Sequence, residues 1–433
     1  MPHLFDGRAV PESLWHIFIP HDRVLILAAS SRTVRTTLLR LHANGESGFK
    51  ITVRVKSPSA AVQRAAQDQG ITSMHMFRDK LIVYSSLVNI SALSVHGFGQ
   101  NFEVQNQAAL GVDVLAAHLE QLPHLVALDI SNNQIGHRGV HTITSALRSS
   151  SLASGLTSLN LSKTGLSSFG ASTFTSLCTP IMMDLRELSL TSLNLNGNGI
   201  SKTAGQELRH LNRLTSLRIL DLSDNNLSHR TNTVPKGDVI ELSAMLYNER
   251  NKTGYIETLN LDRNNLDPVG LVTFYRNLPL FTTLTDLSLE QNKLAHYTIK
   301  RLAAALEKSP HVKTLNLSAN PITHDTMEIF SERLMRSGVS TLVYRRASIS
   351  DQSAKVLFDN LRHGNLLEIL DLQDNDIKDG KVIVDGLHPD KGLRSLNLRG
   401  NPVRRSDRAV QSWMCGENGR RIERALCQLL IDN

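Results

Sequence analysis

The sequence is poor in cysteine: its 433 residues include only Cys178, Cys415 and Cys427. Three scattered cysteines provide neither a disulfide framework nor the paired ligands of a zinc site, and they are typical of a reducing compartment. The sequence also lacks a run of about 18 apolar residues, which excludes a membrane-spanning helix. Its first residues show neither a signal peptide nor a transit peptide. We therefore expect a cytoplasmic or nuclear protein with no membrane segment.

Aromatic residues are scarce as well, at 5% of the chain, and the charges are nearly balanced, with 47 basic and 40 acidic residues. Nucleic-acid-binding proteins concentrate positive charge on one face and interleave it with aromatic residues. The composition therefore argues against nucleic acid as a partner. The sequence further lacks a Walker loop, a GxGxxG motif, an HExxH motif and a CxxC pair. We accordingly predict a protein that is not an enzyme and holds no cofactor or metal.

The chain does contain a repeated pattern, LxxLxLxxNxL, of which residues 284–294 are the clearest copy. Residues 295–306 follow it with apolar residues at helical spacing. Ten copies begin at Leu125, Leu156, Leu190, Leu217, Ile256, Leu284, Val312, Val339, Leu367 and Leu393, after a degenerate copy at Ile90. Most copies are 27 or 28 residues long. A single copy cannot bury its apolar face, whereas a stack of copies can.

This pattern resembles the leucine-rich repeats of the ribonuclease-inhibitor class. The resemblance implies an α/β fold, a right-handed leucine-rich-repeat solenoid or horseshoe, with parallel strands on the concave side and helices on the convex side. We expect about ten to eleven repeats in residues 90–403, an N-terminal capping α/β segment in 49–89 and a C-terminal helical cap in 404–433. Within the cap, we predict an amphipathic helix that carries Ile422, Ala425, Leu426 and Leu429 on one face.

Residues 1–48 have a different composition, and three short helices are predicted there, the third from Thr33 to Leu41. Val10-Pro11, Ile17-Phe18 and the segment Ala29 to Arg32 resemble an F-box. The resemblance implies that a ubiquitin-ligase adaptor would contact a set of four residues: Pro11, Leu14, Ile17 and Phe18. The match lacks the usual Trp after the Arg and is shorter than the family pattern. A plain helical cap on the first repeat is the alternative interpretation.

The Asn of each repeat is predicted to turn into the core and bond backbone groups there, because an unpaired buried polar group is costly. These structural residues are Asn133, Asn198, Asn225, Asn264, Asn292, Asn320, Asn375 and Asn401. Thr164 replaces the Asn in one copy and could fill part of this role, whereas Ala347 in another could not.

Strand side chains alternate between faces, so the residues between the leucines point outward. Among them we predict a partner-binding acidic patch and a basic patch toward the C-terminal end. The acidic patch comprises Asp262, Asp286, Ser288 and Glu290, and the basic patch comprises Arg345, Arg346 and Arg399. Two patches of opposite sign suit a protein partner with complementary charges. The copy with Tyr344, Arg345 and Ala347 departs most from the pattern, either as a decayed repeat or as a contact hot spot.

The resulting hypothesis is non-catalytic protein–protein recognition by the concave face. If the F-box resemblance holds, the protein would be a substrate receptor of a cullin-RING ubiquitin ligase. A structural scaffold subunit is an alternative. A GTPase-activating protein similar to those that act on Ran is a further one, although the chain ends in RRIERALCQLLIDN and lacks their strongly acidic tail.

Overall fold

In a computed structural model, the chain forms two compact units, Met1–Leu217 and Arg218–Asn433. The residues that the structure describes are 37–42, 50–55, 90–96, 112–113, 115–119, 122, 125–166, 180–200, 208–227, 255–266, 268–361, 366–387, 392–404, 406–415 and 428–430.

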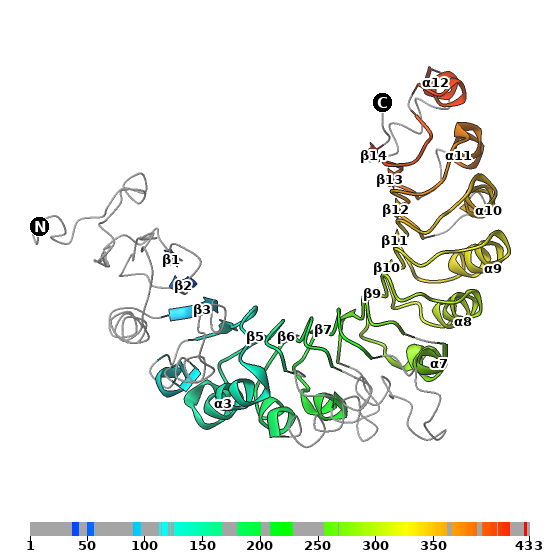
Figure 1. The fold of residues 1–433 in the computed structure, drawn as a ribbon. Coiled ribbons are helices and arrows are strands. Elements are labelled where there is room, and N and C mark those ends of the chain that lie inside the picture. The colour runs from blue at the N-terminus through cyan, green and yellow to red at the C-terminus, as the bar shows by residue number, and fades with distance from the viewer. Residues whose placement is uncertain are drawn as a thin grey trace, which may run out of the picture. The chain divides into compact units, whose positions relative to one another are not determined.

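The first unit contains a sheet of six described strands (Figure 1). These are β1 (Thr37–His42), β2 (Lys50–Val55), β3 (Ile90–His96), β4 (Ala127–Asp129), β5 (Ser158–Asn160) and β6 (Ser192–Asn194). The first three pair antiparallel, and from β3 to β6 the pairing is parallel. Its helices include α3 (Gly136–Ser149), η3 (Ser151–Ala153) and η5 (Arg209–Arg213).

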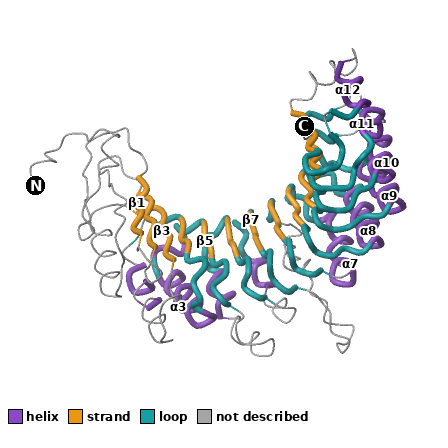
Figure 2. Tube along the Cα trace, turned by 45° about the horizontal axis from the view of Figure 1, so that its top comes forward, coloured by secondary structure: helices purple, strands orange, loops and turns teal. Residues whose placement is uncertain are grey.

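The second unit is a stack of repeats whose strands pair in parallel in chain order. Its strands are β7 (Ile219–Asp221), β8 (Thr258–Asn260), β9 (Asp286–Ser288), β10 (Thr314–Asn316), β11 (Thr341–Val343), β12 (Ile369–Asp371), β13 (Ser395–Asn397) and β14 (Gln428–Leu430). Its helices are α7 (Pro268–Asn277), η6 (Leu278–Leu280), α8 (His296–Leu306), α9 (His324–Leu334), α10 (Asp351–Leu361), α11 (Gly380–Gly386) and α12 (Arg408–Cys415). Within this unit the strands line one side and the helices the other (Figure 2).

Each strand from β4 to β13 is three residues long and has a leucine at its centre. That leucine is buried in every one of these strands, as in Leu287 at 1% exposure. The residues on either side of it point to the outward face, and most of them are half-buried. The strands therefore confirm the predicted alternation of inward leucines and outward polar residues. The helix predicted after Leu294 is also confirmed as α8, whose Ile299 and Leu302 are fully buried.

The residue before each repeat's Asn position has a left-handed backbone in all ten copies, with φ between 51° and 74°. These residues are Asn132, Lys163, Gly197, Asp224, Arg263, Gln291, Ala319, Arg346, Asp374 and Gly400. This conformation is unfavourable for residues other than glycine, so surrounding interactions must hold it. The turn directs the next side chain into the core.

The eight predicted structural Asn side chains are all buried, between 0% and 6% exposed. Asn320 shows the bonding pattern. Its Nδ2 donates to the carbonyls of Leu317 in its own repeat and Leu289 in the preceding one, each at 2.9 Å. Its Oδ1 accepts the backbone N–H groups of Asn292 at 3.0 Å and Leu294 at 3.1 Å. One amide thus forms three hydrogen bonds to the preceding repeat and one within its own.

The two copies without Asn are accommodated differently. Thr164 donates its hydroxyl to the carbonyl of Leu161 at 2.9 Å, so it replaces one bond of the amide. Ala347 has no polar side chain, and its own carbonyl accepts the N–H of Ile322 at 3.1 Å. In four other copies of the second unit, the equivalent N–H groups bond to an Asn Oδ1; these are the N–H groups of Leu266, Leu294, Ile349 and Ile377.

Tyr344, in a leucine position of the Ala347 copy, points into the core and is fully buried. Its ring packs edge-on against Phe330, with 6.0 Å between the centroids. The hydroxyl has no hydrogen-bond partner among the described residues, and burial raises its pKa far above the usual value. Since the ring faces inward, Tyr344 itself offers no contact surface to a partner.

Two predicted helices are wrong where the structure describes them. Residues 37–42 of the predicted third helix form strand β1, in which Leu39 pairs with Val53 and Leu41 with Ile51. The residues Thr37, Leu39 and Leu41 alternate with period two, and this alternation is typical of a strand.

At the other end, the last residues of the predicted 422–429 helix form strand β14, where Leu429 pairs with Leu396 and continues the leucine column. The F-box-like residues Pro11, Leu14, Ile17 and Phe18 lie outside the described residues.

Substitution of Asn320 by Ala is expected to lower the free energy of unfolding by at least about 1–3 kcal/mol, because it leaves buried backbone groups of two repeats unpaired. Urea denaturation followed by circular dichroism measures the change. Asn226→Ala is the matched control, since Asn226 is exposed. Equal effects of the two substitutions would contradict the proposed role of the buried amide.

Substitution of Tyr344 by Phe is expected to raise the free energy of unfolding by about 1 kcal/mol, because it removes a buried hydroxyl without a partner and keeps the ring. The same denaturation experiment applies, with the half-exposed Tyr297 changed to Phe as the control. A loss of stability in Tyr344→Phe would show that the hydroxyl has a bonding role.

Candidate functional site

The outward face of the second unit's sheet carries the predicted partner-binding residues. Its middle column consists of the last residue of each strand, which is mostly Asn or Asp. In β7, β8, β10, β12 and β13 this side chain accepts the N–H of the residue two positions later, at 2.9–3.2 Å. This local bond is the usual turn-forming role of Asn and Asp, so the column stabilises the exit from each strand.

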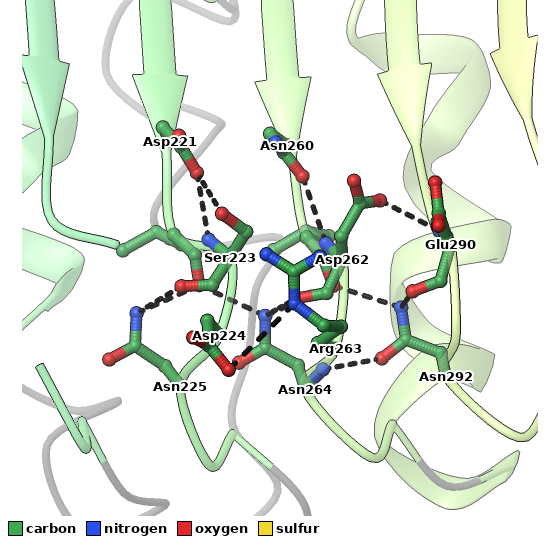
Figure 3. A network of polar contacts seen from close by, with 12 residues as sticks. Asp221, Ser223, Asp224, Asn225, Asn260, Asp262, Arg263, Asn264, Glu290 and Asn292 are labelled. Carbon is green, nitrogen blue, oxygen red and sulfur yellow. Dashed lines mark hydrogen bonds and ion pairs between the residues drawn. The ribbon is translucent and has the colours of Figure 1, made fainter. Parts of the chain in front are cut away.

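Ser288 and Val343 in this column do not form that bond, and the preceding repeat supplies the acceptor instead. The N–H of Glu290 donates to Oδ1 of Asp262 at 2.7 Å (Figure 3). The N–H of Arg345 donates to Oγ of Ser318 at 3.1 Å. The residues that depart from the pattern are thus compensated one repeat earlier.

Asp262 therefore stabilises the backbone of the next repeat. It is 9% exposed, and its Oδ1 also accepts the hydroxyl of Ser288 at 2.6 Å. Burial raises the pKa of its carboxyl group, and the hydrogen bonds from Ser288 and Glu290 oppose that rise. Asp262 can therefore offer little surface to a partner, although it fixes the backbone from which Glu290 projects.

The predicted acidic and basic patches are not separate. Arg346 reaches across β10 to Glu290, with 2.7 Å between its NH2 nitrogen and Oε1. Arg345 pairs with the buried Asp371 at 2.6 Å, and this ion pair raises the pKa of its guanidinium. Sequence spacing could not show these pairs, because they join residues 56 and 26 positions apart. The centre of the face is electrically neutral as a result.

Charges without an ion pair among the described residues lie on either side of this neutral centre. Asp221 accepts bonds from Ser223, and Asp286 accepts the hydroxyl of Thr285 at 2.6 Å. Arg399, at the end of β13, is exposed. The face therefore remains acidic at β7–β9 and basic at β13, with the charges farther apart than the sequence suggested.

Two apolar side chains on this face were not predicted as site residues. Ile219 and Ile369 begin β7 and β12, point outward, and are 48% and 42% exposed. Equivalent positions in the other strands of this unit hold Thr, Ser, Asp or Gln. The sequence alone could have identified these two residues as site candidates, because an isoleucine at an outward strand position has no packing role in its own repeat.

In the first unit, the nearly buried Asp184 lies between groups of α3. Its carboxylate is 3.2 Å from Nε of Arg148, 3.2 Å from Oγ1 of Thr144 and 3.6 Å from Nε2 of His141. A buried carboxylate with a cation and a hydroxyl is satisfied structurally, so we interpret it as a tether between neighbouring repeats.

Within the described part of the chain, no cluster of His, Cys, Asp and Glu has a composition and geometry suited to a metal ion. None of the helices there is both long and apolar enough to cross a bilayer.

The strand, turn and helix repeats with their buried Asn residues define a leucine-rich-repeat α/β solenoid. Models of leucine-rich repeats match residues 121–143 and 188–208, and 216–236. The chain is also 28% identical over 263 residues to the tubulin-specific chaperone E of Danio rerio, an alignment that covers 59% of this chain. It spans less than half of that relative, 43% of its length.

Two solved structures are similar at 17% identity. An internalin from Listeria monocytogenes has a TM-score of 0.44, with 82% of this chain and 88% of the internalin covered. TLR13 in a complex with ssRNA13 has a TM-score of 0.37, with 68% of this chain and 34% of TLR13 covered.

Substitutions of Asp262 test its structural position. Asp262→Ala is expected to lower the free energy of unfolding by about 1–3 kcal/mol, because the N–H of Glu290 loses its acceptor. Asp262→Asn keeps an acceptor oxygen and removes a buried charge, so we expect stability at pH 7 equal to or above that of the unsubstituted protein.

The pH dependence has a defined sign. Because the folded-state pKa lies above the ordinary value, the carboxylate is protonated first in the folded protein, and its cost to stability decreases as the pH falls through that pKa. Any advantage of Asp262→Asn should therefore shrink on acidification. Urea denaturation at several pH values measures this, and a constant or growing advantage would contradict it.

Proposed function

We propose that the protein is a non-catalytic recognition module that binds a protein partner on the outward face of the second unit's strands. The observation that supports this most directly is the arrangement of charge on that face. Asp221 and Asp286 on β7 and β9, and Arg399 at the end of β13, form no ion pair with a described residue, and they flank a centre neutralised by its own ion pairs. Such a distribution favours a partner with defined, opposite charges at two separate places.

The exposed Ile219 and Ile369 support the same proposal. A half-exposed isoleucine is stabilised when a partner removes it from water, by about 25 cal/mol for each Å² of apolar area buried. Each of them lies near one of the charged regions, Ile219 on the same strand as Asp221 and Ile369 on the strand that pairs with β13. Apolar contacts would supply affinity, and the charges would set orientation.

Tubulin is the first partner to test, because the similar Danio rerio protein is a tubulin-specific chaperone. We expect the protein to bind purified tubulin dimer, and Asp286→Lys combined with Arg399→Glu to weaken binding about tenfold, through charge repulsion at both ends. Fluorescence anisotropy with labelled tubulin measures the affinity. Glu328→Lys with Lys381→Glu makes the same charge changes on exposed residues of the helix side.

Unchanged affinity in the sheet-face variant, together with a loss in the helix-side control, would overturn the proposed face. No binding of tubulin by the unsubstituted protein would exclude tubulin as the partner.

The narrower role of a ubiquitin-ligase substrate receptor rests on the resemblance of Val10 to Arg32 to an F-box. Residues 37–42, at the end of the helix predicted after this segment, form strand β1 instead. We therefore place this hypothesis second. Pull-down of the ligase adaptor, lost in Leu14→Asp with Ile17→Asp, would support it. Absence of binding by the unsubstituted protein would leave the scaffold alternative, and stimulated GTP hydrolysis by a small GTPase would identify the Ran-type alternative.

A further inference from the structure

A second exposed surface lies on the helix side of the second unit, over α7, η6 and α8. The two repeats concerned begin at Ile256 and Leu284, 28 residues apart, and α8 packs against both α7 and η6. Residues that differ by 28 in number are therefore equivalent in neighbouring repeats. By this register Arg276 corresponds to Ala304, and Leu280 corresponds to Lys308.

The surface is basic. We define the α8 patch as Arg276, Leu280, Tyr297, Lys300, Arg301 and Lys308. None of its four cations forms an ion pair with a described residue, and three of them are exposed. The helices α7, η6 and α8 contain no Asp or Glu. The carboxylate that directly follows α8, Glu307, is bound by Arg333 at 2.8 Å and Arg336 at 3.4 Å, both on the α9 side.

The same surface is also apolar. Leu280 and Tyr297 are each 47% exposed and belong to the small set of large apolar side chains exposed in the described chain. The guanidinium of Arg301 lies 4.8 Å from the centroid of the Tyr297 ring. This cation–π contact holds both groups in place, which lowers the entropy that a ligand must overcome to use them.

The basic surface ends sharply at α9. The residues equivalent to Tyr297, Lys300 and Ala304 are Asp325, Glu328 and Glu332, so the sign of the charge reverses within one repeat. A long, uniform polyanion such as a nucleic acid would meet repulsion there. A short acidic segment that lies along α8 would not.

We propose that the α8 patch docks an acidic, amphipathic segment of a protein partner, in which Asp and Glu pair with the four cations and a Leu or Phe packs on Leu280 and Tyr297. This surface is on the side of the unit opposite to the strand face. It could therefore act together with the strand face or without it.

The probe for this surface is a fluorescein-labelled synthetic peptide composed of Glu, Asp, Leu and Phe, titrated with the full chain. We expect saturable binding that weakens as sodium chloride is raised, because exposed charge pairs are screened. A peptide with Ser in place of Leu and Phe should bind more weakly. A labelled single-stranded DNA oligonucleotide of equal charge should bind more weakly than the apolar acidic peptide.

Arg301→Glu with Lys308→Glu should weaken peptide binding about tenfold, while Lys378→Glu with Lys381→Glu makes the same charge change on exposed cations near α11 and should leave it unaltered. Tyr297→Ala with Leu280→Ser tests the apolar contribution without a change of charge and should also weaken binding. Circular dichroism confirms folding of each variant.

No saturable binding of the peptide, equal losses in the α8 and α11 variants, or tighter binding of the DNA would each overturn the proposal. Because tubulin binding to the strand face is measured with different substitutions, either proposal can fail without the other.

Discussion

The structure depends on the buried Asn amide of most repeats, which forms hydrogen bonds to the backbone of the preceding repeat. In Asn320 that amide satisfies two carbonyls and two N–H groups, so a repeat is complete only when the next one is in place. The leucines supply most of the favourable free energy of burial, but they are not directional. The amide ladder sets the spacing at which the leucines stack and the outward columns align.

The strand face follows from this constraint. Since equivalent residues are held in register, a missing side chain can be compensated across repeats, as Asp262 does for the Ser288 copy and Ser318 for the Val343 copy. Some polar residues on the face are therefore occupied by the backbone. The residues proposed to bind a partner are ones whose side chains do not accept a backbone N–H from a neighbouring repeat, among them Asp286, Arg399 and the exposed isoleucines.

The sequence was sufficient for the features that repeat. Ten strands, their inward leucines and helix α8 could be predicted because the residue pattern that specifies them recurs in many copies along the chain. It was insufficient where a feature occurs once. The pairs of Arg346 with Glu290 and Arg345 with Asp371 depend on how far a side chain reaches over its neighbours, and β1 and β14 were mistaken for helices because their leucines fit both periods.

The left-handed turn before each Asn position divides every repeat into a part of fixed length and a part whose length can vary. From the strand to that turn, no residue can be added or removed without displacing the amide that follows. The segment between that turn and the next strand has no such requirement: the copies at Leu217 and Ile256 are 39 residues apart, yet β7 and β8 still pair in register. Changes in length can therefore accumulate in that segment of a repeat while the strand face keeps its spacing.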